Sequence, residues 1–154
     1  PKEIKPEPTQ VEKLRKFLEP EIAEGIVAVL EDANTITVRI IGGGMFKSAS
    51  DVMKPEYRAR VQRVAEALND EPGNVLVVGH SDSDPLSRRS RFKSNLDLSL
   101  KRAQTVMAFM AKFMKDPDRL RAEGRGAREP LKPNTTRENK AQNRRIEVIL
   151  LKAN

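Results

Sequence analysis

The sequence contains no cysteine, and this absence excludes disulfide bonds and thiolate metal sites. Aromatic residues make up only 4% of the 154 residues, with one tyrosine and no tryptophan. Stacking of bases on aromatic side chains and zinc-finger recognition are both unsupported, so we expect no nucleic-acid partner. No signal peptide is visible in these residues, and no apolar run approaches the roughly 20 residues that a membrane-spanning helix needs.

Basic residues outnumber acidic ones, and the formal net charge of +7 predicts an anionic partner. Residues 1–10 are polar and rich in proline, which is typical of a linker. We therefore expect a domain cut from a longer protein, with any membrane anchor upstream of this chain. The domain itself is expected at 11–152, with an N-terminal extension over about 11–34.

Apolar periodicity predicts an α/β sandwich, with helices packed on a mixed sheet. A helix is expected after residue 11, broken at Pro20, and another from Pro55 to Leu68. A third helix, capped by Ser99, carries an apolar face through Met114. A short helix is expected at 137–144. The predicted strands are 26–30, 35–41, 74–80, 119–123 and 146–151.

Charged residues stand at the ends of these predicted elements. Asp82 follows the apolar strand 74–80, and Arg102 lies in the first turn of a helix that begins at Ser99. A cation there opposes the helix dipole, which favours a role toward a ligand or a carboxylate. Asn143, Arg144 and Arg145 precede the last strand. An acid and several bases at element ends predict a cleft for a zwitterionic ligand.

Two other motifs have simpler explanations. The alternation of His80, Asp82 and Asp84 could bind a metal or serve a hydrolase, but we favour a structural His80 that hydrogen-bonds backbone. Asp82 could equally cap a turn. The Gly42–Gly44 run lacks the glycine before Lys-Ser that a phosphate loop requires, so we expect a connection with Phe46 packed inward. We expect no metal and no cofactor.

Five sequence blocks resemble the OmpA-like peptidoglycan-binding domain. They are GHSDSDP (79–85), SNLDLSLKRAQTV (94–106), DRLRAEGRG (118–126), PLKPNTT (130–136) and NRRIEVILL (143–151). The long spacer between Asp82 and Arg102 resembles the flagellar stator MotB branch. Residues 16–57 are similar to the periplasmic C-terminal region of the TssL (DotU/IcmH-like) family of type VI secretion. Leu96 and Asp97 stand where those two branches commonly have Trp-Glu.

The resemblance implies a βαβαββ fold that binds the meso-diaminopimelate of the peptidoglycan stem peptide. In it, Asp82 accepts hydrogen bonds from the ligand ammonium and Arg102 pairs with its carboxylate. The remaining site residues that it implies are Asn95, Leu98, Asn143, Arg144 and Arg145.

The expected function is non-enzymatic: a periplasmic domain that anchors an inner-membrane type VI secretion component to the cell wall. Other proteins of the secretion membrane complex are expected partners. One alternative is a protein-interaction module of that complex with a degenerate wall site, and a wall hydrolase is another. The basic loop 87–93 either contacts the wall or guides an anionic polymer toward the cleft.

Overall fold

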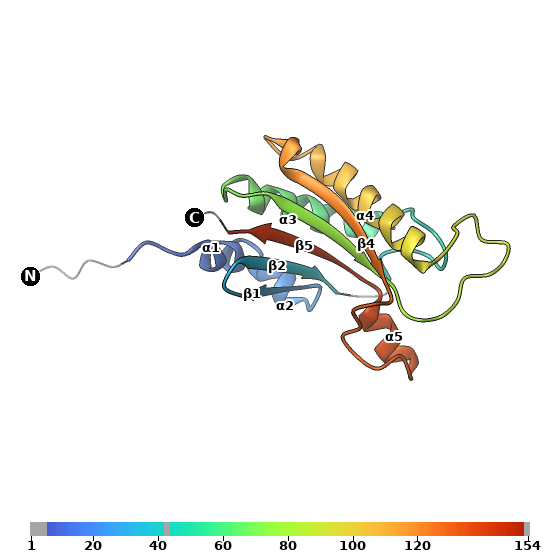
Figure 1. Ribbon diagram of the computed structural model, residues 1–154. Coiled ribbons are helices and arrows are strands. Elements are labelled where there is room, and N and C mark those ends of the chain that lie inside the picture. Colours follow the sequence, from blue (N-terminus) through green and yellow to red (C-terminus); the bar gives the residue numbers. More distant parts are fainter. Residues whose placement is uncertain (1–5, 42–43, 153–154) are drawn as a thin grey trace, which may run out of the picture.

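The computed structural model describes residues 6–41 and 44–152, which form one mixed sheet with helices packed against it (Figure 1). Its five strands have the spatial order β1-β2-β5-β3-β4. Only β3 and β4 pair in parallel, and the other neighbours are antiparallel. The strands are β1 (Val27–Glu31), β2 (Thr35–Ile40), β3 (Val75–His80), β4 (Leu120–Gly126) and β5 (Arg145–Leu151). The predicted α/β fold is confirmed: β2, α3 (Arg58–Asn69), β3, α4 (Asn95–Ala111), β4 and β5 follow the βαβαββ order, with β1 added before it and a short helix, α5 (Arg137–Asn143), inserted between β4 and β5.

The predicted break at Pro20 separates two short helices, α1 (Gln10–Phe17) and α2 (Glu19–Ala23). The Thr9 hydroxyl caps α1 by accepting the Glu12 N–H at 3.3 Å. Pro20 occupies the first turn of α2, where its missing N–H has no cost. Leu18 joins the two helices and is fully buried, so this N-terminal extension is part of the core.

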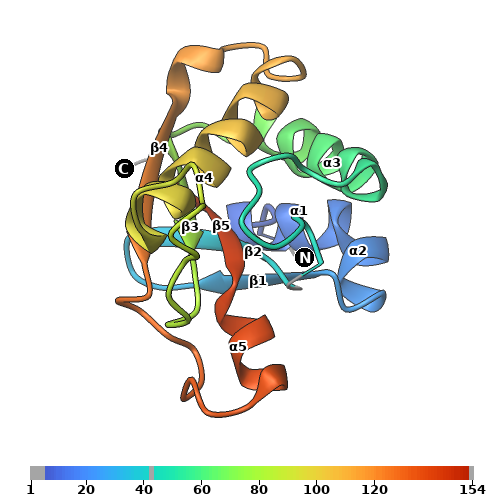
Figure 2. The same ribbon diagram turned by 90° about the vertical axis from the view of Figure 1, so that its right-hand side faces the viewer.

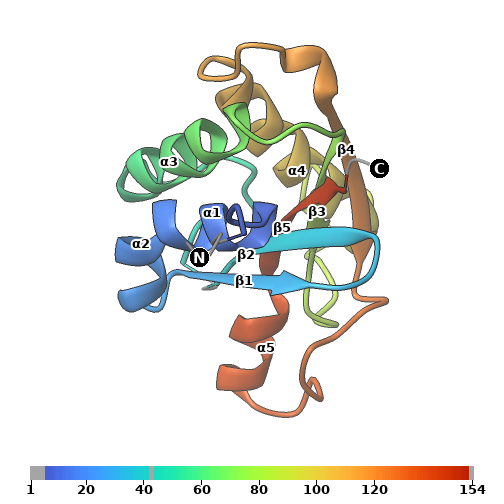
Figure 3. The same ribbon diagram turned by 90° about the vertical axis from the view of Figure 1, so that its left-hand side faces the viewer.

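The main helices cover one side of the sheet. A 3₁₀ turn, η1 (Pro55–Tyr57), leads into α3 (Arg58–Asn69), and α4 (Asn95–Ala111) packs against β3 and β4. Figures 2 and 3 show α1 to α4 gathered on one side of the twisted sheet, with α5 (Arg137–Asn143) apart from them. The 3₁₀ turn η2 (Pro117–Arg119) precedes β4. None of the helices in 6–41 and 44–152 is long and apolar enough to cross a bilayer.

The start of α4 differs from the prediction, which placed the cap at Ser99. The cap is Ser94, whose backbone is extended and whose hydroxyl accepts the Asp97 N–H at 3.1 Å. Ser99 instead lies inside the helix, 1% exposed, where its hydroxyl donates to Leu96 O and accepts the Gly126 N–H. Arg102 therefore lies beyond the first turn, and the argument from the helix dipole was wrong.

Close contact with the backbone of α4 explains why positions 79 and 124 are glycine. A Cβ atom at Gly79 of β3 would lie 2.1 Å from the Ser99 carbonyl oxygen. One at Gly124 of β4 would lie 2.5 Å from the Leu100 nitrogen. The two glycines let α4 lie directly on the parallel pair β3–β4. This contact fixes the start of α4 beside the end of β3.

A charged network crosses the sheet face opposite the core side chains of β5. Glu147 is paired in register with Arg39 of β2 and lies two residue pairs from the match of His80 with Arg145. Its carboxylate accepts from Arg39 Nε at 2.7 Å, Arg145 Nε at 3.3 Å and His80 Nε2 at 3.1 Å. Burial alone would raise the pKa of Glu147, but the hydrogen bonds from His80 and Arg39 and the charge of Arg145 lower it well below its ordinary value.

Candidate functional site

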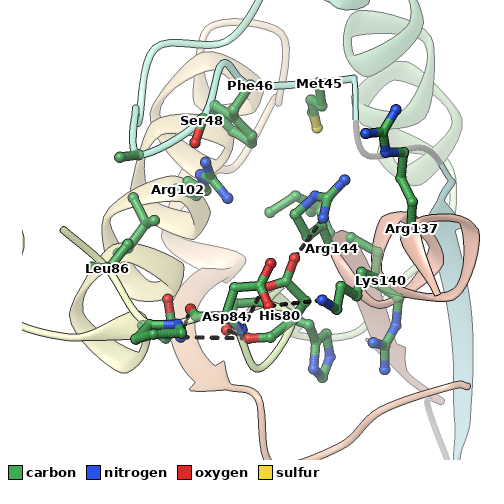
Figure 4. Close-up of a pocket in the computed structure, with 18 residues that line it drawn as sticks. Met45, Phe46, Ser48, His80, Asp84, Leu86, Arg102, Arg137, Lys140 and Arg144 are labelled. Atoms are coloured by element: carbon green, nitrogen blue, oxygen red, sulfur yellow. Dashed lines mark hydrogen bonds and ion pairs between the residues drawn. The ribbon is translucent and has the colours of Figure 1, made fainter. Parts of the chain in front are cut away.

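A pocket of about 510 Å³ opens at the end of the sheet where β3 ends, α4 begins and α5 leads into β5 (Figure 4). Residues from 45–49, 80–86, 95–102 and 137–146 line it. The structure brings six of the seven sequence-predicted site residues to this pocket: Asp82, Asn95, Leu98, Arg102, Arg144 and Arg145. The predicted cleft between an acid and a base therefore exists as one continuous surface.

Asp82 provides a buried carboxylate, with 7% of the residue exposed. Its Oδ1 accepts the Asp84 N–H at 2.9 Å, which closes the turn that follows β3. Its Oδ2 pairs with Arg144 Nη1 at 2.5 Å. The turn role and the site role considered from the sequence are thus compatible, because a carboxylate has about four acceptor positions.

Arg102 provides a buried guanidinium, 8% exposed, held by the loop that precedes η1. Its Nε donates to Ser50 O at 2.8 Å and its Nη2 to Lys47 O at 3.1 Å. Between these two carbonyls, Ala49 adopts a φ of 52°, which is uncommon outside glycine and turns the loop back. The guanidinium also lies 5.0 Å from the centre of the Phe46 ring. Burial, with a contribution from the charge of Arg144, lowers the pKa of Arg102 to about 10.

Asn95 and Leu98, on the first turn of α4, shape the wall between the acid and the base. The Asn95 amide donates to Asp84 O at 2.8 Å and to Asp82 O at 3.5 Å. It therefore holds the turn that carries Asp82. Leu98 is 3% exposed and supplies apolar surface to the pocket.

The three predicted site residues at the junction of α5 and β5 have different positions. Arg144 reaches Asp82, as described, and Arg145 donates to Glu147, to Asn143 O and to Glu129 O. Asn143 is the predicted site residue that does not line the pocket. Its fully buried amide accepts from Leu131 and Lys132 N–H and donates to Lys132 O. It holds the connection between β4 and α5 in place.

Sequence reasoning missed two basic residues of α5 that line the pocket, Arg137 and Lys140. Lys140 Nζ pairs with Asp84 Oδ1 at 3.0 Å. The Thr136 hydroxyl caps this short helix by accepting the Asn139 N–H at 3.0 Å. The positions 137, 140 and 144 follow helical spacing, and this signal in the sequence could have identified a basic face.

The hydrogen-bond partner of His80 is a side chain and not the backbone that was expected. The His80 ring is buried and contacts Glu147, while Nδ1 has no hydrogen-bond partner among the described residues. Within 6–41 and 44–152, no three His, Asp or Glu side chains are arranged to hold a metal ion. Gly42 and Gly43 lie outside the described residues. Phe46 is packed into the core, as expected.

The basic loop 87–93 directly follows the segment 80–86, which lines the pocket, and is mostly exposed. Phe92 is its buried anchor, at 7% exposure. Arg91 stacks on the Phe92 ring at 4.6 Å and pairs with Asp51. Arg88, Arg89 and Lys93 remain exposed. The loop therefore combines one residue that joins it to the 45–51 loop with three that carry surface charge.

Comparison with known proteins agrees with this geometry. Residues 45–144 match the OmpA family. Motility protein B of Helicobacter pylori is 32% identical over 68% of this chain and 42% of its own length. Probable lipoprotein YiaD of Escherichia coli is 31% identical over 80% of this chain and 55% of its own length. The chain thus spans about half the length of the relatives it matches.

Two solved structures share the fold over nearly the whole chain. The cell wall anchor of the type VI secretion system from Pseudomonas aeruginosa has a TM-score of 0.82 and 36% identity, covering 91% of this chain and 97% of the other. A putative MotB-like protein from Desulfovibrio vulgaris has a TM-score of 0.83 and 27% identity, covering 94% and 90%. The likeness to OmpA-like domains and to a type VI secretion component that the sequence indicated is confirmed. The chain belongs to the OmpA family.

Proposed function

We propose that this chain is a non-enzymatic peptidoglycan-binding domain that anchors an inner-membrane component of type VI secretion to the cell wall. One observation carries the proposal: a buried carboxylate, Asp82, and a buried guanidinium, Arg102, line the same pocket. Family membership and the likeness to a secretion-system cell wall anchor support it. The proposal places the domain in the periplasm, with the membrane anchor outside this chain and other proteins of the secretion complex as partners.

The ligand that suits this pocket is the zwitterionic end of meso-diaminopimelate in the stem peptide. Asp82 would accept hydrogen bonds from the ligand ammonium at acceptor positions that remain beside the bond from Arg144. Arg102 donates two of its five N–H groups to backbone carbonyls of the 47–50 loop. Its other N–H groups, which have no acceptor among the described residues, would pair with the ligand carboxylate.

Three further residues would act indirectly, by supporting Asp82 and Arg102: Asn95, Leu98 and Asn143. Asn95 holds the Asp82 turn, and Leu98 excludes water from the wall beside it. Asn143 holds the connection that carries α5. Arg144 would remain beside Asp82 and add positive charge near the ligand carboxylate, while Arg145 joins the site to the Glu147 network.

Sedimentation with purified peptidoglycan tests this function. We expect the chain to sediment with diaminopimelate-type sacculi, and soluble stem peptide to release it in a concentration-dependent manner. The chain should liberate no soluble wall fragments during the incubation, because the proposal assigns it no catalysis. A chain that stays in the supernatant at micromolar concentrations, yet binds another secretion protein, would support the interaction module instead.

The exposed part of the basic loop gives a prediction about salt. Neutralising Arg88, Arg89 and Lys93 together should weaken sedimentation with sacculi at low ionic strength and have little effect near 0.5 M salt. Exposed charges act over about 8–10 Å at physiological salt and are screened above it. Arg91 stays unchanged because it holds the loop to Asp51. An equal loss at both salt concentrations would mean that the loop contacts the wall directly, and the steering account would then be wrong.

A further inference from the structure

The pocket carries more positive charge than a zwitterion can balance. Its lining has five cationic side chains, which are Arg102, Arg137, Lys140, Arg144 and Arg145, and two carboxylates, Asp82 and Asp84. The zwitterionic end of diaminopimelate brings one ammonium and one carboxylate, and so adds no net charge. Electrostatic complementarity between pocket and ligand therefore requires further negative charge on the ligand.

The internal ion pairs show where this excess lies. Arg144 pairs with Asp82, Lys140 with Asp84, and Arg145 with Glu147 behind the pocket. Arg102 and Arg137 have no carboxylate partner among the described residues. Arg102 is the proposed partner of the diaminopimelate carboxylate. Arg137 is therefore the cation of the pocket for which neither the described residues nor the zwitterionic end supplies a carboxylate.

Arg137 lies away from the Asp82–Arg102 pair, on a separate element. Figure 4 shows Arg102 on one side of the pocket and Arg137 on the other, with Met45 and Phe46 between them along the upper wall. Arg137 and Lys140 are three residues apart on α5 and thus share a face of that helix. The cap at Thr136 and the buried Asn143 fix both ends of the helix. The backbone of α5 is thus fixed before any ligand binds, and the Asp84 pair holds Lys140, while the exposed Arg137 side chain makes no hydrogen bond or ion pair with the described residues.

We propose that Arg137, assisted by Lys140, forms a second carboxylate subsite, so that the domain distinguishes stem peptides with free carboxylates from amidated ones. This inference rests on the proposed function and adds a chemical selectivity to it. The relevant ligand groups are the α-carboxylate of the glutamate that precedes diaminopimelate and the carboxylate at the peptide end of diaminopimelate itself. Arg is suited to this task because its planar guanidinium can donate two parallel hydrogen bonds to one carboxylate.

Calorimetric titration with three synthetic peptides tests the subsite. The first is the tripeptide L-alanyl-γ-D-glutamyl-meso-diaminopimelate with all carboxylates free. The second is amidated at the glutamate α-carboxylate, and the third at the peptide-end carboxylate of diaminopimelate. For the unmodified domain, we expect one of the two amidations to weaken binding by about tenfold, the value of one charge-assisted hydrogen bond. Which one does so identifies the carboxylate that Arg137 binds.

The variant Arg137→Gln should bind the free peptide about tenfold more weakly and lose its sensitivity to that amidation. Arg128→Gln is the matched control, because it removes the same charge from an exposed residue that does not line the pocket. If amidation weakens Arg137→Gln as much as the unmodified domain, the subsite is wrong. If the unmodified domain binds all three peptides equally, the subsite is also wrong but the wall-binding function stands. If it binds none of them, both proposals fail.

Discussion

Asp82→Asn is expected to lower the affinity for the diaminopimelate stem peptide by about tenfold to a hundredfold, with an unchanged fold. The range follows from the roughly 1.5–3 kcal/mol that a hydrogen bond to a charged group contributes when it is shielded from water. Asparagine keeps the oxygen that accepts the Asp84 N–H, so the turn after β3 can persist. It loses the charge that the ligand ammonium and Arg144 both require.

The neighbouring acid provides the control for this prediction. Asp84 lines the same pocket, but its side chain is 57% exposed and its partner is Lys140 at the surface. Exposed ion pairs contribute about 0–1 kcal/mol, so Asp84→Asn should change the affinity by less than about fivefold. Isothermal titration of both variants with the stem peptide measures the difference. Equal losses in the two variants would mean that pocket charge in general, and not the Asp82 contact, determines binding.

Glu147→Gln is expected to destabilise the domain by about 3–5 kcal/mol at pH 7, the usual cost of removing one partner from a buried ion pair. The substitution leaves Arg145, which is 6% exposed, without a carboxylate and weakens the bond to Arg39. Burial lowers the pKa of Arg145, and the charge and the hydrogen bond of Glu147 act against this shift. Urea unfolding followed by circular dichroism measures the change in the free energy of unfolding.

The effect of Glu147 should also depend on pH. Because the pKa of this carboxyl is lowered in the folded state, its contribution to stability is complete above its ordinary pKa of 4.5 and is lost as the pH falls further. The difference between the unmodified domain and Glu147→Gln should therefore be constant from pH 6 to 8 and shrink below about pH 4.5. The control is Glu123→Gln. Val78 of β3 has Glu147 of β5 opposite it on one side and Glu123 of β4 on the other, and the Glu123 side chain is about half exposed. If Glu123→Gln lowered the free energy of unfolding as much as Glu147→Gln does, the role given to the burial of Glu147 would be contradicted.

Local patterns in the sequence were enough to predict the elements of the fold. The continuous apolar run of β3 and the alternating, β-branched run of β2 indicated their strands, and Pro20 indicated the break between α1 and α2. The start of α4 was predicted wrongly because Ser94 and Ser99 are equally good caps by residue type. The contact of Ser99 with β4 decides between them, and that contact depends on the tertiary structure.

The same limit applies to the site. Asp82 and Arg102 could be proposed because a family motif carries each of them, and the structure places both in one pocket. The pairing of His80 with Glu147 depends on the register of β3 against β5, which no local pattern specifies. The contact of Lys140 with Asp84 depends on how α5 is turned toward the β3 end, which Asn143 fixes through hydrogen bonds to a distant loop.

A comparison of two peptides that differ at the side-chain end of one residue tests the central claim most directly. Lysine has the ammonium of diaminopimelate at that end but lacks the carboxylate beside it. If Asp82 and Arg102 grip the two groups together, the diaminopimelate tripeptide should bind the unmodified domain at least about tenfold more tightly than the lysine tripeptide. The variant Arg102→Lys, which keeps the charge but not the planar fork, should reduce this preference. Equal affinity of the unmodified domain for the two peptides would contradict the account.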